Sequence, residues 1–234
     1  MVTTVLFDLD GTLLPMDQDT FVKSYIGRMA KKLAPHGYDP ELLTAGLWKG
    51  TGAMVKNTGE KTNEEVFWSV FNALHGRDCQ KDEELFMEYY RGEFQRVAQD
   101  CGFDARAAET IAEIKTLGYR VGLATNPLFP AIATHSRAKW AGLNPEDFEL
   151  ITTYENSRHC KPNPDYYRDI LATLNLKPEN CVMVGNDVQE DMVAETLGMK
   201  VFLLTDNLIN RTGEDISRYP HGSFPELMTF IREL

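Results

Sequence analysis

The sequence predicts an α/β protein: a doubly wound, Rossmann-like parallel sheet with an inserted all-helical domain. Two observations lead to this prediction. Beyond residue 104, short apolar runs alternate with amphipathic helical segments, which is typical of a parallel sheet covered by helices on both faces. Between residues 18 and 98, apolar residues recur at three- and four-residue spacing, which predicts helices only. We therefore expect an α/β domain of residues 1–16 and 99–234 and a helical domain of residues 17–98.

The first strand is predicted at Val5-Leu6-Phe7, a short apolar run suited to the buried centre of a sheet. Helices of the insertion follow, marked by periodic apolar residues within 21–33, 66–74 and 85–94. The alternation then runs to the end of the chain. Its elements are helix 105–117, strand 120–124, helix 131–141, strand 148–152, helix 164–174, strand 182–184, helix 188–197, strand 200–204 and helix 224–234.

Composition limits the possible functions. A net charge of −11 argues against nucleic acid as a partner, because phosphate backbones attract basic surfaces. No apolar run approaches the length of about 20 residues that crosses a bilayer, and we see no signal peptide. The four cysteines form no Cys-x-x-Cys pair, which favours reduced thiols and a cytoplasmic location.

Two carboxylates, Asp8 and Asp10, follow the first strand directly. Isolated buried charges are costly, so such a pair usually holds a cation or takes part in chemistry. Ligands of open α/β sheets bind just beyond the carboxyl ends of the strands. Gly11, the next residue, allows a close backbone approach or an unusual φ. This segment is therefore the first candidate for a functional site.

Four segments in order resemble the motifs of the haloacid dehalogenase-like (HAD) superfamily. Asp8-Leu9-Asp10-Gly11-Thr12 resembles motif I, and Thr125 ends a strand as in motif II. Lys161-Pro162 resembles motif III, and the Gly-x-Asp-x-x-x-Asp run of residues 185–191 resembles motif IV. The resemblance implies a C1 cap, inserted just after motif I, and the sheet order 5-4-1-2-3 with the first strand central.

The resemblance also implies a mechanism. Asp8 is the nucleophile, which forms an aspartyl-phosphate, and a carboxylate needs no base to activate it at neutral pH. Asp10 is the general acid and base, which protonates the leaving group and then deprotonates water. Lys161 neutralises the phosphate and the nucleophile. Thr125 and Asn126 bind the phosphate through their side chains.

A magnesium ion is the implied cofactor. Asp8, the main-chain carbonyl of Asp10 and Asp187 are its expected protein ligands, completed by a phosphate oxygen and water, as Mg²⁺ prefers octahedral oxygen coordination. Asp191 lies one helical turn beyond Asp187. It either ligates the metal, holds a metal-bound water or the motif III lysine, or is an ordinary carboxylate at a helix start.

The expected activity is Mg²⁺-dependent hydrolysis of a small-molecule phosphate monoester. The second carboxylate, Asp10, is absent from haloacid dehalogenases and phosphonatases of the superfamily, so it favours phosphoryl transfer. A sugar phosphomutase fits the same residues. A non-catalytic binding protein with this fold is the other alternative, although no motif residue is missing.

Substrate selection is expected from the helical domain. The glycine-rich segment 48–58 carries Lys49 and Lys56 and is our candidate for the part that faces the site; the alternative is a plain exposed loop. The three tryptophans are expected in the core or at the interface between the domains.

Overall fold

A computed structural model describes all 234 residues. Its centre is a five-stranded parallel sheet in the order β2-β1-β3-β4-β5, and the strands are β1 (Thr4–Phe7), β2 (Arg120–Leu123), β3 (Cys181–Gly185), β4 (Lys200–Leu204) and β5 (His221–Gly222). β1 lies between β2 and β3, with Leu6 paired to Gly122 on one side and to Met183 on the other. The α/β prediction is confirmed, and so is the relative order of these strands up to β4.

Two elements differ from the prediction at the edges of the sheet. The strand expected at 148–152 is reduced to one bridge between Ile151 and Leu123. The segment still runs parallel to β2, because the Glu149 N–H donates to the main-chain oxygen of Val121 and the Leu123 N–H to that of Leu150, but the pairing is too short to form a strand. At the opposite edge the two-residue strand β5 was not predicted, since two residues show no periodicity.

The helix predicted at 188–197 is wrong in its first half. Oδ1 of Asp187 accepts the backbone N–H groups of Gln189 and Glu190 at 2.9 and 3.0 Å, which forms a tight turn. Only the 3₁₀ helix η6 (Met192–Leu197) follows. The carboxylate competes with the helical hydrogen bonds for these donors, as Asp side chains often do.

Helices cover both faces of the sheet, as predicted. Along β1, Val5 and Phe7 belong to one buried cluster and Leu6 to another, because alternate residues of a strand point to opposite faces. The helices α5 and α8 contribute to the first cluster, and α7 contributes to the second. The helical elements of this part are α5 (Ala105–Thr116), α6 (Ala131–Trp140), η4 (Pro145–Asp147), α7 (Pro164–Thr173), η5 (Pro178–Asn180), η6, η7 (Ile216–Arg218) and α8 (Phe224–Arg232).

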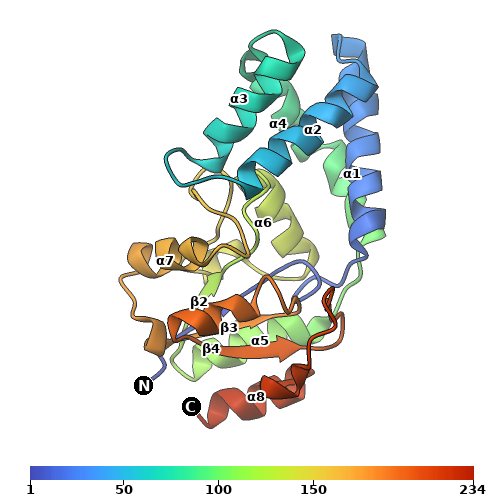
Figure 1. The fold of residues 1–234 in the computed structure, drawn as a ribbon. Helices are drawn as coiled ribbons and strands as arrows, with labels where there is room; N and C mark the ends of the chain where they lie inside the picture. Colours follow the sequence, from blue (N-terminus) through green and yellow to red (C-terminus); the bar gives the residue numbers. More distant parts are fainter.

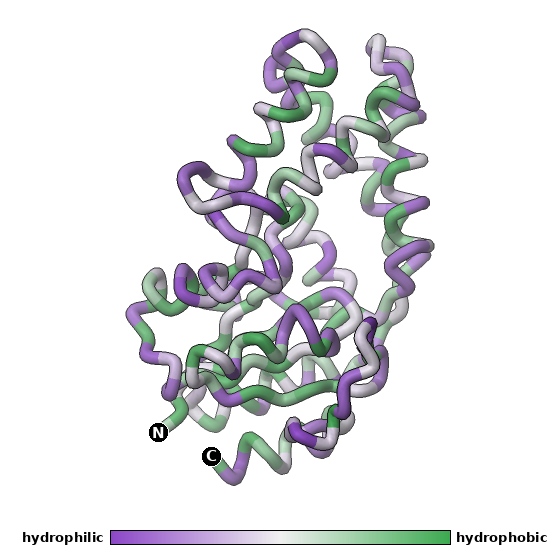
Figure 2. The backbone as a smooth tube through the Cα atoms, in the orientation of Figure 1, coloured by the Kyte–Doolittle hydropathy of each residue, from purple (hydrophilic) through white to green (hydrophobic).

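The inserted segment contains only helices and lies above the sheet in Figure 1, with α6 between the two. Its elements are α1 (Gln18–Leu33), η1 (Ala34–His36), α2 (Pro40–Val55), α3 (Asn63–His75), η2 (Cys79–Asp82), α4 (Glu83–Arg91) and η3 (Glu93–Asp100). Figure 2 shows apolar and polar residues alternating along these helices, as expected when one face is buried. The exact domain boundaries remain a prediction.

Side chains define where these helices begin. The Asp17 carboxylate accepts the Thr20 N–H at the start of α1, and Thr62 with Glu65 forms a reciprocal capping box at the start of α3. The two chain segments that enter and leave the insertion are paired. Met16 and Cys101 form an antiparallel bridge, and the Gly102 N–H donates to the main-chain oxygen of Pro15 at 2.7 Å.

The helices pack around a second core that is rich in aromatic side chains. This cluster also includes Ala133 of α6 and two loop residues of the α/β part, Tyr154 and Cys160, so the insertion is packed directly against the sheet domain. No helix of the structure has the length and apolarity that crossing a membrane requires.

Candidate active site

A cavity of about 170 Å³ lies beyond the carboxyl ends of β1, β2 and β3. The three strands deliver polar residues to it because parallel strands end at the same edge. A carboxylate that was not predicted, Glu190, also lines the cavity. Six of the predicted site residues line it: Asp8, Asp10, Thr125, Asn126, Asp187 and Asp191.

Lys161 lies beneath this cavity and is buried, with Nζ 2.8 Å from Oδ1 of Asp8 and 2.7 Å from Oδ1 of Asp191. Burial alone would lower the pKa of Lys161, but the carboxylates of Asp191 and Asp8 raise it well above its ordinary value. The lysine therefore stays cationic. Oδ2 of Asp191 accepts the Asp187 N–H at 3.0 Å, so one carboxylate links the lysine to the motif IV loop.

Two glycines are required by close approaches around these carboxylates. Gly11 has φ near 85°, and a Cβ there would lie 2.3 Å from Nδ2 of Asn186. At Gly185 a Cβ would lie 2.0 Å from Oδ2 of Asp191. Real Cβ atoms do not approach other atoms so closely, so larger residues would displace these side chains.

Asp8 is held by two contacts. Lys161 binds one of its oxygens, and the Thr12 hydroxyl donates to the other at 3.0 Å. That hydroxyl also lies 2.9 Å from Oδ1 of Asn186, so its single proton serves one acceptor at a time. The carboxylate is thus fixed in orientation while it faces the cavity.

Asp10 forms an ion pair with Arg137, a residue that the sequence reasoning missed. Arg137 lies on α6 and is completely buried, with its guanidinium carbon 4.3 Å from the centroid of the Phe129 ring. Burial raises the pKa of Asp10, and the charge of Arg137 opposes that shift. The only sequence signal was the position of Arg137, four residues after Ala133 on the small-residue face of the predicted helix.

Arg137 and Asp10 are not fully satisfied by each other. Oδ1 of Asp10 and Nε of Arg137 are both buried and lack a hydrogen-bond partner. Buried polar atoms in proteins are usually paired, so these two mark a place where a ligand or water completes the site.

Asp187 is also paired with a cation that was not predicted. Its Oδ2 lies 2.5 Å from Arg211, a half-exposed residue in the loop after β4. The loop carries no motif, so nothing in the sequence indicated the contact.

Side-chain hydroxyls fix the main chain of the loop after β2. The main-chain oxygen of Thr125 accepts hydrogen bonds from the hydroxyls of Thr152 and Tyr166 at 2.6 and 2.8 Å. Nδ2 of Asn126 donates to Glu190 at 3.1 Å, while its buried Oδ1 has no partner. Burial raises the pKa of Glu190.

The family model for "haloacid dehalogenase-like hydrolase" matches residues 2–194. The chain belongs to the HAD-like hydrolases. Over 211 residues it is 25% identical to the pyrophosphatase PpaX of Bacillus cereus, which covers 90% of this chain and 86% of that protein. The expected superfamily, and with it a hydrolase, is confirmed.

Solved structures show the same fold. A HAD phosphatase from Thermococcus onnurineus is 21% identical, with 98% of each chain covered and a TM-score of 0.59. A 2-haloacid dehalogenase from Pseudomonas syringae is 18% identical, with 100% of this chain and 99% of that chain covered and a TM-score of 0.63. One fold therefore serves both kinds of enzyme, and the site residues must distinguish them.

The cavity of this HAD protein suits a hard cation. Five carboxylates line it, from Asp8, Asp10, Asp187, Glu190 and Asp191, and only three cationic side chains pair with them. No three His, Cys, Asp or Glu side chains gather as a preformed metal site. The expected set of two carboxylates and one carbonyl does not require such a cluster, and carboxylate and carbonyl oxygens are the donors that Mg²⁺ prefers.

The helical domain contacts the cavity through other residues than those predicted. Segment 48–58 is mostly the second half of α2, not a loop, and Lys49 and Lys56 are exposed and do not line the cavity. Phe21 and Val22 of α1 lie there instead. Helical periodicity was obscured by the two glycines of this segment, of which Gly50 packs against the Phe67 ring and Gly52 is exposed.

The prediction for the tryptophans is wrong in one case. Trp48 is 56% exposed, whereas Trp68 is buried and Trp140 packs on Phe94 with ring centroids 4.9 Å apart.

Proposed function

We propose that this HAD hydrolase is a Mg²⁺-dependent phosphatase of small-molecule phosphate monoesters that acts through an aspartyl-phosphate on Asp8. The observation that carries the proposal is the geometry around this residue. A carboxylate fixed by a buried lysine faces a cavity that a second carboxylate, Asp10, also lines. The relative named a pyrophosphatase supports phosphoryl chemistry.

In the first half-reaction an oxygen of Asp8 attacks phosphorus and the ester P–O bond breaks. Asp10 gives its proton to the leaving oxygen, which departs as an alcohol. The raised pKa of Asp10 suits a proton donor. In the second half-reaction Asp10 takes a proton from water as that water attacks phosphorus. The acyl-phosphate bond breaks, so that inorganic phosphate leaves and the Asp8 carboxylate is restored.

Lys161 and the bound Mg²⁺ would both reduce the electrostatic repulsion between Asp8 and the phosphoryl group. An anionic nucleophile must meet an anionic phosphoryl group, and Lys161 reduces that repulsion from beneath Asp8. Asp8, the Asp10 carbonyl and Asp187 would hold Mg²⁺, which when bound neutralises charge on the phosphoryl oxygens. Thr125 and Asn126, which line the cavity, would donate to the phosphate.

Asp10 is also the residue that distinguishes this site from the dehalogenases that share its fold. Dehalogenation releases a halide, which requires no proton donor. Here the donor is present, buried and paired with Arg137. The phosphatase reaction uses this residue, and the dehalogenase reaction does not.

The test is phosphate release by purified protein with Mg²⁺, measured over a panel of sugar, carboxylic-acid, nucleotide and aryl phosphates together with pyrophosphate. We expect turnover of several monoesters and none by Asp8→Asn. A phosphomutase would instead convert one sugar phosphate into its isomer without releasing phosphate. Release of halide from 2-haloacids, or turnover of no phosphate compound, would overturn the proposal.

A further inference from the structure

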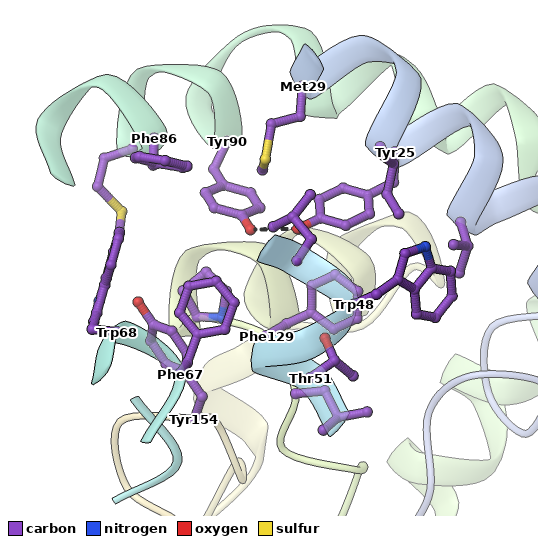
Figure 3. Close-up of a pocket in the computed structure, with 16 residues that line it drawn as sticks. Tyr25, Met29, Trp48, Thr51, Phe67, Trp68, Phe86, Tyr90, Phe129 and Tyr154 are labelled. Atoms are coloured by element: carbon purple, nitrogen blue, oxygen red, sulfur yellow. Dashed lines mark hydrogen bonds between the residues drawn. The ribbon is translucent and has the colours of Figure 1, made fainter. Parts of the chain in front are cut away.

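An apolar chamber of about 170 Å³ lies between the helices of the insertion and loops of the α/β domain (Figure 3). Of its 16 lining residues, 14 are hydrophobic, and no charged side chain is among them. Figure 3 shows aromatic rings around its walls, from several helices and from the loops of the α/β domain: Tyr25, Phe67, Trp68, Phe86, Tyr90 and Phe129.

The chamber is next to the proposed site of chemistry. Val22 of α1, Leu128 and Phe129 line both the chamber and the cavity that contains Asp8. The two spaces therefore share a wall. A substrate whose phosphate lies on Asp8 would have to extend its leaving group in the direction of this wall or toward solvent.

The chamber offers a few polar atoms among its rings. The indole Nε1 of Trp68 is buried and lies near the Tyr154 hydroxyl without a well-formed hydrogen bond. The hydroxyls of Tyr25 and Tyr90 lie 3.1 Å apart and bond to each other. An unpaired buried donor is uncommon in a finished core, so Trp68 marks a place where a ligand acceptor would be favoured.

The size and polarity of the chamber define what it would bind. An apolar cavity of about 150 Å³ is large enough to bind benzene, so this chamber accommodates about one six-membered ring. Charged groups are excluded because no charged side chain in the walls would offset the free-energy cost of removing them from water.

We infer that the chamber binds the leaving group of the substrate, and that this group is an aromatic or apolar ring. The substrate class is then an aryl or arylalkyl phosphate ester. This inference rests on the proposed phosphatase function and makes it narrower. The inferred substrate class also differs from pyrophosphate, because pyrophosphate has no apolar part that could occupy the chamber.

The kinetic test compares benzyl and 2-phenylethyl phosphate with glycerol 3-phosphate and pyrophosphate. Thr51 lines the chamber from α2, and Thr51→Met would fill part of it. Thr44→Met is the matched control, since it makes the same change two turns earlier on α2, outside the chamber. We expect the wild type to favour the ring esters by at least about tenfold in kcat/KM, and Thr51→Met to remove most of that preference.

Turnover of glycerol 3-phosphate should stay within about twofold in both variants, which shows that Thr51→Met folds and keeps its chemistry. Equal kcat/KM for ring and ring-free esters, or an unchanged preference in Thr51→Met, would overturn the inference while leaving the phosphatase proposal intact.

A binding test does not depend on catalysis. Saturation-transfer NMR with 2-phenylethanol, which carries no phosphate, should detect binding to the wild type and to Thr44→Met but not to Thr51→Met. Absence of binding to the wild type would contradict the inference. Binding without any phosphatase activity would instead support the chamber and contradict the proposed chemistry.

Discussion

Arg137 forms an ion pair with Asp10 across 127 positions of the sequence, and its side chain is completely buried. The guanidinium comes from α6 of the sheet domain, not from the inserted helices. The proposed acid and base is therefore oriented by a helix of the same domain that carries the nucleophile. Phe21 of α1 also lies beside this guanidinium, with its ring centroid 6.0 Å from the guanidinium carbon, so the helical domain contacts the pair as well.

Arg137→Lys should lower kcat about tenfold with little change in KM, because an ammonium cannot reproduce the planar, forked contact of a guanidinium. The pH profile of kcat should change as well, because burial raises the pKa of Asp10 and the charge of Arg137 counteracts that rise. Arg120→Lys is the control, as it alters an exposed pair with Glu149 and should leave kinetics unchanged. An unaltered kcat and pH profile would make Arg137 purely structural.

Asp8→Asn should fold normally and lose at least about 10³-fold in kcat, roughly 4 kcal/mol of barrier, because an amide is not a nucleophile. Circular dichroism and phosphate release check the two parts. If this variant keeps more than about a tenth of wild-type kcat, the aspartyl-phosphate mechanism is wrong.

Removal of divalent metal with EDTA should abolish turnover, and added Mg²⁺ should restore it. Ca²⁺ should substitute poorly, because its larger and more flexible shell would misplace the phosphate against the nucleophile. Full activity in metal-free buffer would contradict the proposed metal dependence and show that Lys161 and the two arginines alone neutralise the charge at the site.

Lys161→Met should depress turnover of every substrate and lower the free energy of unfolding by about 3 kcal/mol, because two buried carboxylates lose their cation. Lys49→Ala and Lys56→Ala serve as controls. Both residues are exposed and away from the cavity, so we expect no change in substrate ranking or stability. A changed ranking of substrates in either control variant would show that Lys49 or Lys56 takes part in substrate selection.

Gly185→Ala should displace the Asp191 carboxylate and thereby loosen Lys161, since the added Cβ would lie 2.0 Å from Oδ2 of Asp191. We expect kcat to fall about 10²-fold, as misplaced catalytic groups often cost that much. In Gly52→Ala, on an exposed face of α2, the new Cβ meets nothing within 4 Å, and the change should stabilise the protein by about 0.5–1 kcal/mol. Wild-type kcat in Gly185→Ala would show that the loop absorbs the methyl group.

The sequence predicted those site residues that sit at strand ends. Asp8, Asp187 and Thr125 follow apolar runs directly, so local pattern and strand direction together place them at one edge of the sheet. Arg137 and Arg211 could not be found this way. One comes from a helix and the other from a loop, and only the three-dimensional packing brings them to their carboxylates.

The same distinction applies to the fold. Periodic helices such as α5, predicted at 105–117 and observed at Ala105–Thr116, were predicted within a residue or two, because many side chains follow one period. Short elements at the sheet edge were not, since β5 has two residues and the 148–152 segment pairs with β2 at a single bridge. Segment 48–58 is mostly helical although its glycines also suit a loop, and it borders the apolar chamber through Trp48 and Thr51, not the carboxylate cavity through its lysines.

The bridge between Met16 and Cys101 has a consequence for how substrate enters and product leaves. Because the two linkers are bonded to each other, the chain enters and leaves the helical domain at a single point. Helix α1 begins two residues beyond this point, and its Val22 borders both the chamber and the carboxylate cavity. Movement of α1 about this point would displace Val22 from the border of both spaces together, so the ring and the phosphate of one substrate would gain or lose access at the same time.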